Sequence, residues 1–342
     1  MASGLGFQQA LFFKESASFN SAEDLSSGTV LVLPVRVNVG FGREVERITT
    51  EHIRGSASVQ AEEDQLGIIN APGSFECVIP TSGAFSYIEK HLLGKVTTSG
   101  PAGTTYTHTN TWNDKLFAGL SFAVNKTGKS YYYHGNQIAS CKMTATVGGP
   151  VVATVNTIGS AAPTPIALVT PPSLSLLAAT PYWLFKHATF KLDTVTEVIT
   201  AFDIDFTNEL MDGADMAYAL GSDTRTNLAK MGHSVSGTIR RRHDLDGTSS
   251  VQSKFYEKFV SGATAALQIT LTHPTDADYT KVINLGHVKF TTGDPKASDR
   301  GHIVEEIPFT AFNLDNAASS IVTTDEAATP ATATGAYDGT GA

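Results

Sequence analysis

Few residues of this sequence have the types and spacing that support chemistry, and the clearest are two aspartates. Asp203 and Asp205 lie two positions apart, so on a strand both side chains would point to one face and could bind a divalent cation. An isolated acidic strand face is more often solvated. The run Asp-Leu-Asp-Gly at 244–247 begins like a calcium loop but lacks the remaining ligands, which favours a turn. We therefore predict no metal site and no cofactor.

The motifs of common catalytic sites do not occur in the sequence. It contains no His-Glu-x-x-His pair, no phosphate-binding glycine loop and no Gly-x-Ser-x-Gly elbow, and its ten histidines are scattered. The two cysteines, Cys77 and Cys141, lie in apolar strand-like runs, so we expect reduced core residues. The sequence therefore predicts no catalytic residue, and we expect a protein that is not an enzyme.

One basic cluster stands out, at residues 240–242. On a strand, Arg240 and Arg242 would face one side and Arg241 the other. The formal net charge is -9, which argues against a sequence-specific DNA-binding protein held by phosphate contacts. Ion pairs to another subunit are at least as consistent with the cluster. Arg240 and Arg242 are therefore candidate subunit contacts.

The elements that must position these residues are mainly strands. Hydrophobic residues make up 41% of the chain and charged residues 17%, which is typical of a globular protein with ample core. The clearest strand is 200–207, where Phe202, Ile204 and Phe206 alternate with the two aspartates. No apolar run is long enough to span a bilayer, so we expect no membrane insertion.

A pattern of elements occurs twice, which indicates an internal duplication. The runs Tyr-Ile-Glu-Lys-His-Leu-Leu-Gly at 87–94 and Phe-Tyr-Glu-Lys-Phe-Val-Ser-Gly at 255–262 each predict a short amphipathic helix that ends at its glycine. A strand-like run that begins at Gly73 or Gly237 precedes each helix, and two strand-like runs follow it. Coincidence is the alternative, because β-rich segments tend to look alike.

The repeat divides the chain into five expected segments: an N-terminal arm at 1–28, a first half at 29–146, a Pro-rich crossover at 147–181, a second half at 182–316 and a flexible C-terminal tail at 317–342. The first half alone contains an insertion at 95–119, whose alternating pattern predicts a projecting β-hairpin. Arm and hairpin would expose aromatic and polar side chains, so candidate subunit contacts there are Phe7, Phe12, Phe13, Tyr106, His108 and Trp112.

A succession of patterns resembles the major tail tube proteins of long, flexible-tailed (siphovirus-type) bacteriophages. The likeness covers about residues 10–312 and is carried by diffuse motifs rather than one signature. These motifs are Glu15-Ser16 followed by Gly28-Thr29, the region 44–55, Gly73 before the first helix, the helix end Leu92-Leu93-Gly94, the run 133–143 with its Tyr-His-Gly-Asn-Gln-Ile start, and the run 199–210.

The resemblance implies a mainly β fold, a tail-tube-type β-sandwich or half-barrel with flanking short helices. Subunits of this family form rings that close a β-barrel around a lumen and stack into a hollow tube. The tape-measure protein fills the tube, tail terminator and tail-tip proteins complete it, and DNA passes through transiently during genome ejection. Such a protein belongs to the virion tail after synthesis in the bacterial host cytoplasm. Asp203 and Asp205 would suit a lumen face, since like charge keeps phosphates from adhering.

The predicted duplication bears on stoichiometry. Relatives with one tube fold per chain form hexameric rings, so a chain with two would form trimeric rings; one tube fold plus a decorating domain would restore the hexamer. Two other classes stay open: the inner tube of a contractile tail or injection device, and a carbohydrate-binding β-sandwich or hydrolase. The last class would need an aromatic-lined cleft or clustered acids.

Overall fold

The computed structural model describes residues 11–19, 23, 25, 30–33, 35–36, 39–49, 64–81, 83–102, 105–126, 129–160, 164–166, 182–213, 217–242, 251–273, 279–292 and 304–325. The described chain is mainly β structure, with antiparallel strands joined in one large sheet that does not close into a barrel. The prediction of a mainly β fold with short helices is therefore confirmed.

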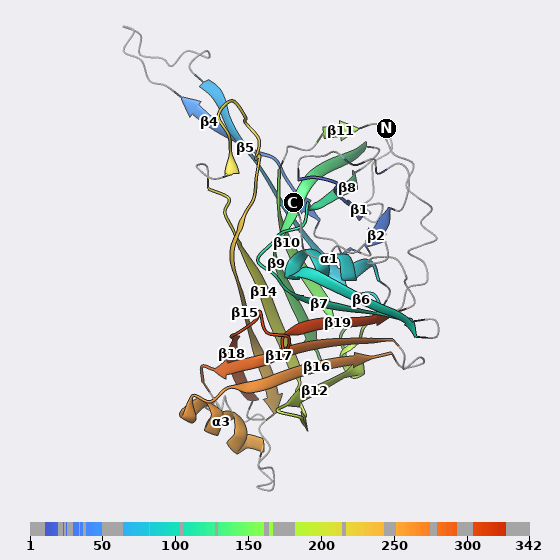
Figure 1. The fold of residues 1–342 in the computed structure, drawn as a ribbon, viewed down its shortest axis with the longest axis vertical. Coiled ribbons are helices and arrows are strands. Elements are labelled where there is room, and N and C mark those ends of the chain that lie inside the picture. Colours follow the sequence, from blue (N-terminus) through green and yellow to red (C-terminus); the bar gives the residue numbers. More distant parts are fainter. Residues whose placement is uncertain are drawn as a thin grey trace.

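One group of strands, which includes the long strands β5, β9 and β15, lies side by side in what we call the long sheet (Figure 1). Their residues alternate between buried and accessible positions, as expected for antiparallel strands with one face on the core. In spatial order they are β3 (Gly40–Phe41) and β4 (Glu44–Thr49), which both pair with β5 (Asp64–Val78), then β10 (Val152–Gly159), β9 (Lys129–Thr146), β14 (Ala201–Leu210), β15 (Lys230–Arg242) and β18 (Val304–Ala311).

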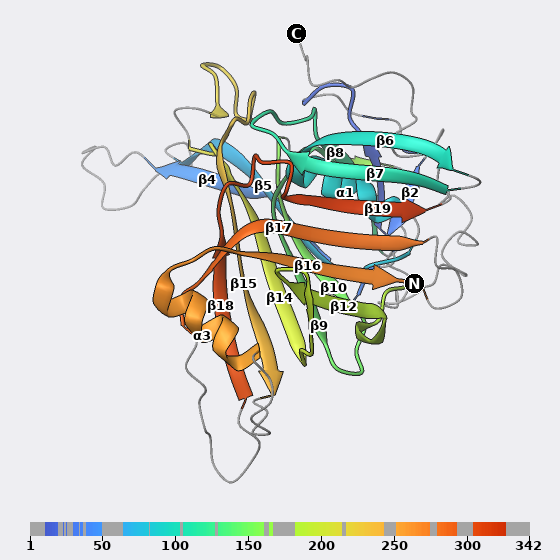
Figure 2. The same ribbon diagram turned by 60° about the horizontal axis from the view of Figure 1, so that its bottom comes forward.

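A second group of strands, the cross sheet, runs across the long sheet (Figure 2). It is continuous with the long sheet because the end of one strand, at Val288, pairs with Ala311 of β18. In order its strands are β13 (Val195–Glu197), β12 (Ala188–Leu192), β16 (Ala265–Thr272), β17 (Thr280–Phe290), β19 (Ser320–Asp325), β7 (Thr105–Trp112) and β6 (Gly94–Ala102).

The first part of the chain forms a smaller group of strands along the N-terminal portion of β9. β2 (Leu31–Leu33) pairs with β1 (Leu11–Glu15), β1 with β8 (Leu120–Lys126), and β8 with β9, while β11 (Thr164–Ile166) pairs with the other edge of β9. A short 3-10 helix, η4 (Phe185–His187), leads into β12. β9 therefore pairs with two groups of strands: its N-terminal portion with this smaller group, and its C-terminal portion with the long sheet.

The structure describes two α-helices, α1 (Ala84–Leu93) and α3 (Val251–Ser261), whose surroundings differ. In α1, every residue from Phe85 to Leu93 is buried, and Figure 1 shows the helix inside the body of the molecule. α3 lies at one end, where Tyr256 is 48% and Val260 65% exposed. Both helices end as predicted at a left-handed glycine, Gly94 with φ 93° and Gly262 with φ 65°.

The strand pairings occur in the same order twice. In the first set of strands, β2 pairs with β1, β1 with β8, β8 with β9, β9 with β10, β10 with β5, and β5 with β3 and β4. In the second set, β13 pairs with β12, β12 with β16, β16 with β17, β17 with β18, β18 with β15, and β15 with β14. β11 and β19 occupy matching edges of β9 and β17.

The match between the two sets extends to single positions. The β8–β9 register shifts between Leu120 and Phe122 while the partner moves from Asn136 to Tyr133. In β16–β17 the same shift lies between Ala265 and Leu267, opposite Val288 and Leu285. Gly73 of β5 lies opposite Thr157 of β10, and Gly237 of β15 opposite Phe309 of β18. These pairs place residue 129 of β9 in the register position that Lys281 has in β17.

The structure modifies three segment predictions. The insertion forms the expected hairpin, β6–β7, but it does not project: β7 pairs with β19, and its alternate residues His108, Asn110 and Trp112 are buried. Residues 152–159 of the expected crossover form β10, and residues 320–325 of the expected tail form β19. Polar alternation in these segments reflects strand edges that another part of the chain pairs, which the sequence pattern alone does not reveal.

Candidate functional site

The accessible side of the long sheet has a uniform chemical character, and we call it the hydroxyl face. Successive strands are in register, so their accessible residues share this side. It consists of Ser74 and Glu76 on β5, Thr154 and Asn156 on β10, Ser140, Lys142 and Thr144 on β9, Asp203, Asp205 and Thr207 on β14, Ser234, Ser236, Thr238 and Arg240 on β15, and Glu306, Pro308 and Thr310 on β18. Both sets of strands contribute to it.

The predicted acidic residues lie in the middle of this face. Asp203 is opposite Thr144 and Thr238, and Asp205 is opposite Lys142 and Ser236. The Lys142 ammonium lies 3.6 Å from the Asp203 carboxylate. A cation would have to compete with this lysine, which argues against a metal site between the two aspartates.

The other acids of the hydroxyl face also have basic neighbours. Arg240 donates a hydrogen bond of 2.8 Å to Glu306, and Arg36 one of 2.9 Å to Glu76. The face is therefore richer in hydroxyls and closer to neutral than the acidic surface expected from Asp203 and Asp205 alone. Acids and bases in pairs leave little basic surface to hold phosphate, so the face would interact weakly with a polyanion.

The remaining predicted contact residues are distributed differently. Phe12, Phe13, His108 and Trp112 are buried within the chain. Tyr106 is half-buried and pairs across strands with Asp325. Arg240 and Arg242 are exposed on β15, and Phe7 lies outside the described residues. Of this set, Arg240 and Arg242 lie on the side of β15 that carries the hydroxyl face, and Arg240 is the nearer to Asp203 and Asp205 along the strand.

Arg241, on the opposite side of β15, is buried against α3. Its guanidinium makes a short hydrogen bond to the buried carboxylate of Glu305 and lies 4.9 Å from the ring centroid of Phe255. The alternation predicted for residues 240–242 is therefore observed, with Arg241 joining strand to helix. Sequence reasoning identified the cluster but did not identify this contact.

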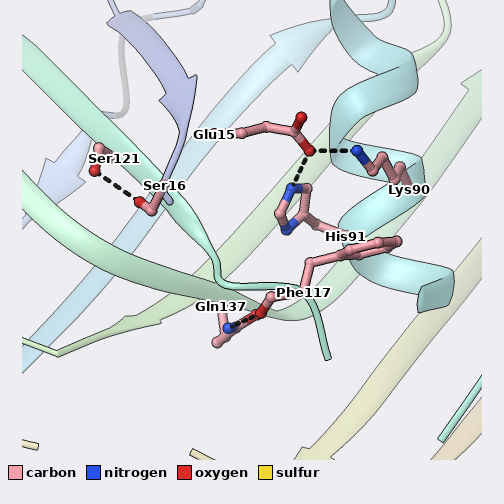
Figure 3. Close-up of polar contacts among 7 residues, drawn as sticks. All are labelled: Glu15, Ser16, Lys90, His91, Phe117, Ser121 and Gln137. Atoms are coloured by element: carbon pink, nitrogen blue, oxygen red, sulfur yellow. Dashed lines mark hydrogen bonds and ion pairs between the residues drawn. The ribbon is translucent and has the colours of Figure 1, made fainter. Parts of the chain in front are cut away.

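A second polar cluster links α1 to β1 and β8 (Figure 3). The Glu15 carboxylate lies 2.6 Å from the Lys90 ammonium and 2.8 Å from Nε2 of His91. Burial alone would raise the pKa of Glu15, but the hydrogen bond and charge of His91 and the charge of Lys90 lower it to about 2. Burial lowers the pKa of His91, so the neutral ring donates its Nε2 proton to Glu15.

The residues beside this cluster fix the loop before β8. Gln137 donates a hydrogen bond of 2.6 Å to the carbonyl oxygen of Phe117. The ring centroid of Phe117 lies 5.2 Å from that of His91. The Ser16 and Ser121 hydroxyls are 2.8 Å apart (Figure 3). These contacts hold helix, arm and sheet together, and their chemistry is structural.

One group of residues offers three close metal-ligand atoms within the described part of the chain. It consists of Asp114, His233 and Asp315, with His233 Nε2 3.1 Å from Asp315 Oδ1. Lys230 contributes positive charge beside His233 and would repel a cation. The two aspartates are exposed. The arrangement is therefore satisfied as a polar cluster in which His233 hydrogen-bonds to Asp315.

A comparison with protein families decides what kind of protein these surfaces belong to. The family described as phage tail tube protein matches residues 6–311, most of the chain. The chain belongs to the phage tail tube protein family. No curated protein matches this tail tube protein. Family membership makes it a component of the phage tail and suggests a structural, non-enzymatic role.

Membership also bears on the individual surfaces of this tail tube protein. Within the described residues, no helix is long and apolar enough to cross a membrane. Both sets of strands contribute to the hydroxyl face, and α3 offers exposed apolar side chains. These two surfaces are the candidates for what a tube protein must do, which is to line a channel and to bind its neighbours.

Proposed function

We propose that this tail tube protein assembles into rings that stack into the phage tail tube, the conduit for genome ejection into the host. The proposal rests on family membership together with the hydroxyl face. That face spans neighbouring strands from both sets without a break in register, as the wall of a channel would. We assign it to the lumen, with Asp203 and Asp205 near its middle.

The chemistry of the hydroxyl face suits the transient, non-specific passage of DNA. Affinity for DNA arises chiefly from basic side chains that neutralise phosphates. Here Lys142 and Arg240 lie beside acids at 3.6 Å and 2.8 Å, so their charge is largely compensated. Hydroxyl groups keep the wall hydrated, so a polyanion would slide past it. Before ejection, the same wall would face the tape-measure protein.

The repeated pairing order of the strands supports a particular number of chains per ring. We propose that the two sets of strands descend from a duplicated tube fold, so that three chains provide six equivalent units per ring. A ring of six chains is the second candidate. Stacking of the rings would be a heterologous contact that continues along the tube, ended by the tail terminator and tail-tip proteins.

The tube of a flexible tail and the inner tube of a contractile tail are distinguished by whether a sheath protein binds the tube. An inner tube of a contractile tail would bind a surrounding sheath protein, whereas the tube of a flexible tail would not. We favour the flexible, long-tailed type on the resemblance of the sequence motifs. A carbohydrate-binding β-sandwich is a separate class and would act as a monomer that binds glycans.

Electron microscopy of the purified, concentrated protein tests this function. We expect hollow tubes or stacked rings, and end-on views that average to threefold symmetry with six similar lobes. Six chains per ring, counted by native mass spectrometry, would contradict the trimer but keep the tube. Monomers that bind glycans and form no tube, even with tail-tip proteins added as initiator, would overturn the proposal.

A further inference from the structure

The two helices provide equivalent positions with unequal surroundings. Aligning Gly94 with Gly262 matches Ile88, Glu89 and Leu92 of α1 with Tyr256, Glu257 and Val260 of α3. The three α1 residues are at most 3% exposed. Their α3 counterparts are all exposed, Tyr256 by 48% and Val260 by 65%. The same helix face is therefore buried in α1 and exposed to solvent in α3.

The helix faces turned toward their own set of strands are alike, which validates the alignment. Lys90 of α1 lies 2.6 Å from Glu15 at the end of β1. Lys258 of α3 lies 2.7 Å from Asp193, the residue after β12, and β12 is the counterpart of β1. Both lysines thus bind an acid at the C-terminal end of the counterpart strands, one register position apart.

The β6–β7 hairpin packs on α1, and the second set of strands covers the part of the helix around Glu89 and Leu92. Glu89 accepts hydrogen bonds from Lys281 of β17 at 2.6 Å and from Thr323 of β19 at 3.1 Å. Asn208 of β14 donates a hydrogen bond of 2.8 Å to the Leu92 carbonyl. The second set therefore docks on the first through α1, and through the pairing of β9 with β14.

In the part of the chain that the structure describes, no third set of strands covers α3 in the same way. We infer that a second copy of this chain covers the exposed face of α3 with its first set of strands. Strand β9 is the counterpart of β17, and residue 129 holds the register position of Lys281. The residue there is again a lysine, Lys129. The contact thus places Lys129 of the next copy at Glu257, and it rests on the ring proposed above.

The sheet edges are consistent with this arrangement. Within the described residues, β18 from Val304 to Ile307 pairs with β15 alone, and the Pro308 carbonyl accepts a hydrogen bond from the Thr291 amide on the other side. Its counterpart β10 pairs on both sides, with β5 and β9. At the other end, β3 has β5 as its single described partner, whereas its counterpart β14 has two. Since β9 is the counterpart of β17, repeating the β9–β14 junction between copies would place β3 of one copy beside the C-terminal end of β17 in the next.

Cross-linking tests the contact directly. The variant Glu257→Cys/Lys129→Cys is treated with a short bismaleimide under assembly conditions. The native thiols will not interfere, because both are buried and burial raises the pKa of Cys77 to about 12. We expect covalent dimers and trimers. Each single-cysteine variant, and the control Val198→Cys/Lys129→Cys with Val198 86% exposed, should give monomers.

The outcomes separate this contact from the proposed function. Rings or tubes seen by microscopy, without products specific to the 257/129 pair, would overturn the contact and leave the tube function intact. If neither assemblies nor cross-linked products form, both proposals fall together.

A second variant tests the apolar part of the face. Val260→Asp should raise the concentration needed for assembly by about tenfold or more, because a carboxylate would be buried against the next copy. Its thermal unfolding as a monomer should match that of wild type, since Val260 is exposed in the single chain. Unchanged assembly would overturn the contact.

Discussion

The ammonium of Lys281 on β17 lies 2.6 Å from the carboxylate of Glu89 on α1, and neither side chain is more than 1% exposed. The two residues come from different sets of strands, 192 positions apart in the sequence. Lys281 also donates a hydrogen bond of 2.7 Å to Thr323 and lies 5.7 Å from the ring of Phe85. This pair therefore links the two sets in the centre of the molecule.

Removing one partner of this pair should be strongly destabilising. Lys281→Met leaves the Glu89 carboxylate buried without its counter-charge, so we expect a loss of about 3–5 kcal/mol in the free energy of unfolding. The double variant Glu89→Leu/Lys281→Met should recover most of that loss, because no uncompensated charge is left. Denaturant unfolding measures both, and Arg240→Ala, which breaks an exposed pair, should change stability by about 1 kcal/mol at most. Equal effects of the two single variants would refute a special role for burial.

The glycines at matching positions of β5 and β15 should tolerate no side chain. A Cβ on Gly73 would lie 2.4 Å from Thr157 Oγ1, and one on Gly237 would lie 2.3 Å from the Asp203 carbonyl oxygen. Replacement of either by alanine should lower the free energy of unfolding by about 1–3 kcal/mol. Gly42→Ala is the control, since nothing lies within 4 Å of its Cβ position. Thermal unfolding of the three variants checks this prediction. Gly237→Ala should be no more stable than Gly73→Ala, and both should be less stable than Gly42→Ala.

Acid should weaken the attachment of α1 to β1. The pKa of Glu15 is lowered from 4.5 to about 2 in the folded chain, so its stabilising effect is complete above about pH 5 and is lost as the pH falls toward 2. Glu15→Gln should be less stable than wild type at pH 7 and should lose less stability between pH 5 and pH 2. Urea unfolding across this range measures the difference. Ser16→Ala, next in the chain and without a titrating group, should keep the wild-type slope.

Basic residues on the hydroxyl face should make DNA adhere. In Asp203→Lys/Asp205→Lys, Lys142 loses its acidic neighbours and the face becomes basic. We expect assembled variant tubes to retain DNA at low salt and to release it as salt is raised, whereas wild-type tubes retain little. Co-sedimentation of tubes with labelled DNA measures this. Asp114→Lys/Asp315→Lys changes the net charge equally at two exposed positions beside His233, on the opposite side of β15 from that face, and should bind less. Equal retention by both variants would argue that the hydroxyl face does not line the lumen.

Local patterns of the sequence identified much of the fold. Alternation at 200–207 predicts the strand β14 with Ile204 buried and Asp203 accessible, because successive side chains of a strand point to opposite faces. The helix spacing and terminal glycines predict α1 and α3, because a left-handed residue ends a helix at little steric cost when it is glycine. The family resemblance is likewise carried by runs of neighbouring residues, and the family match confirms its coarser part, a phage tail tube protein.

Long-range contacts could be known only from the tertiary structure. Nothing in the spacing of Glu89 and Lys281 predicts their contact, and the alternating polar pattern of β7 does not reveal that β19 pairs with it. Burial of a polar side chain is decided by what packs on it, and here the covering strands lie about 200 residues away in the sequence. The sequence by itself determines the elements and their repeated order, through local sterics and hydrophobic periodicity. The tertiary structure alone decides that one helix of the pair is covered and the other exposed.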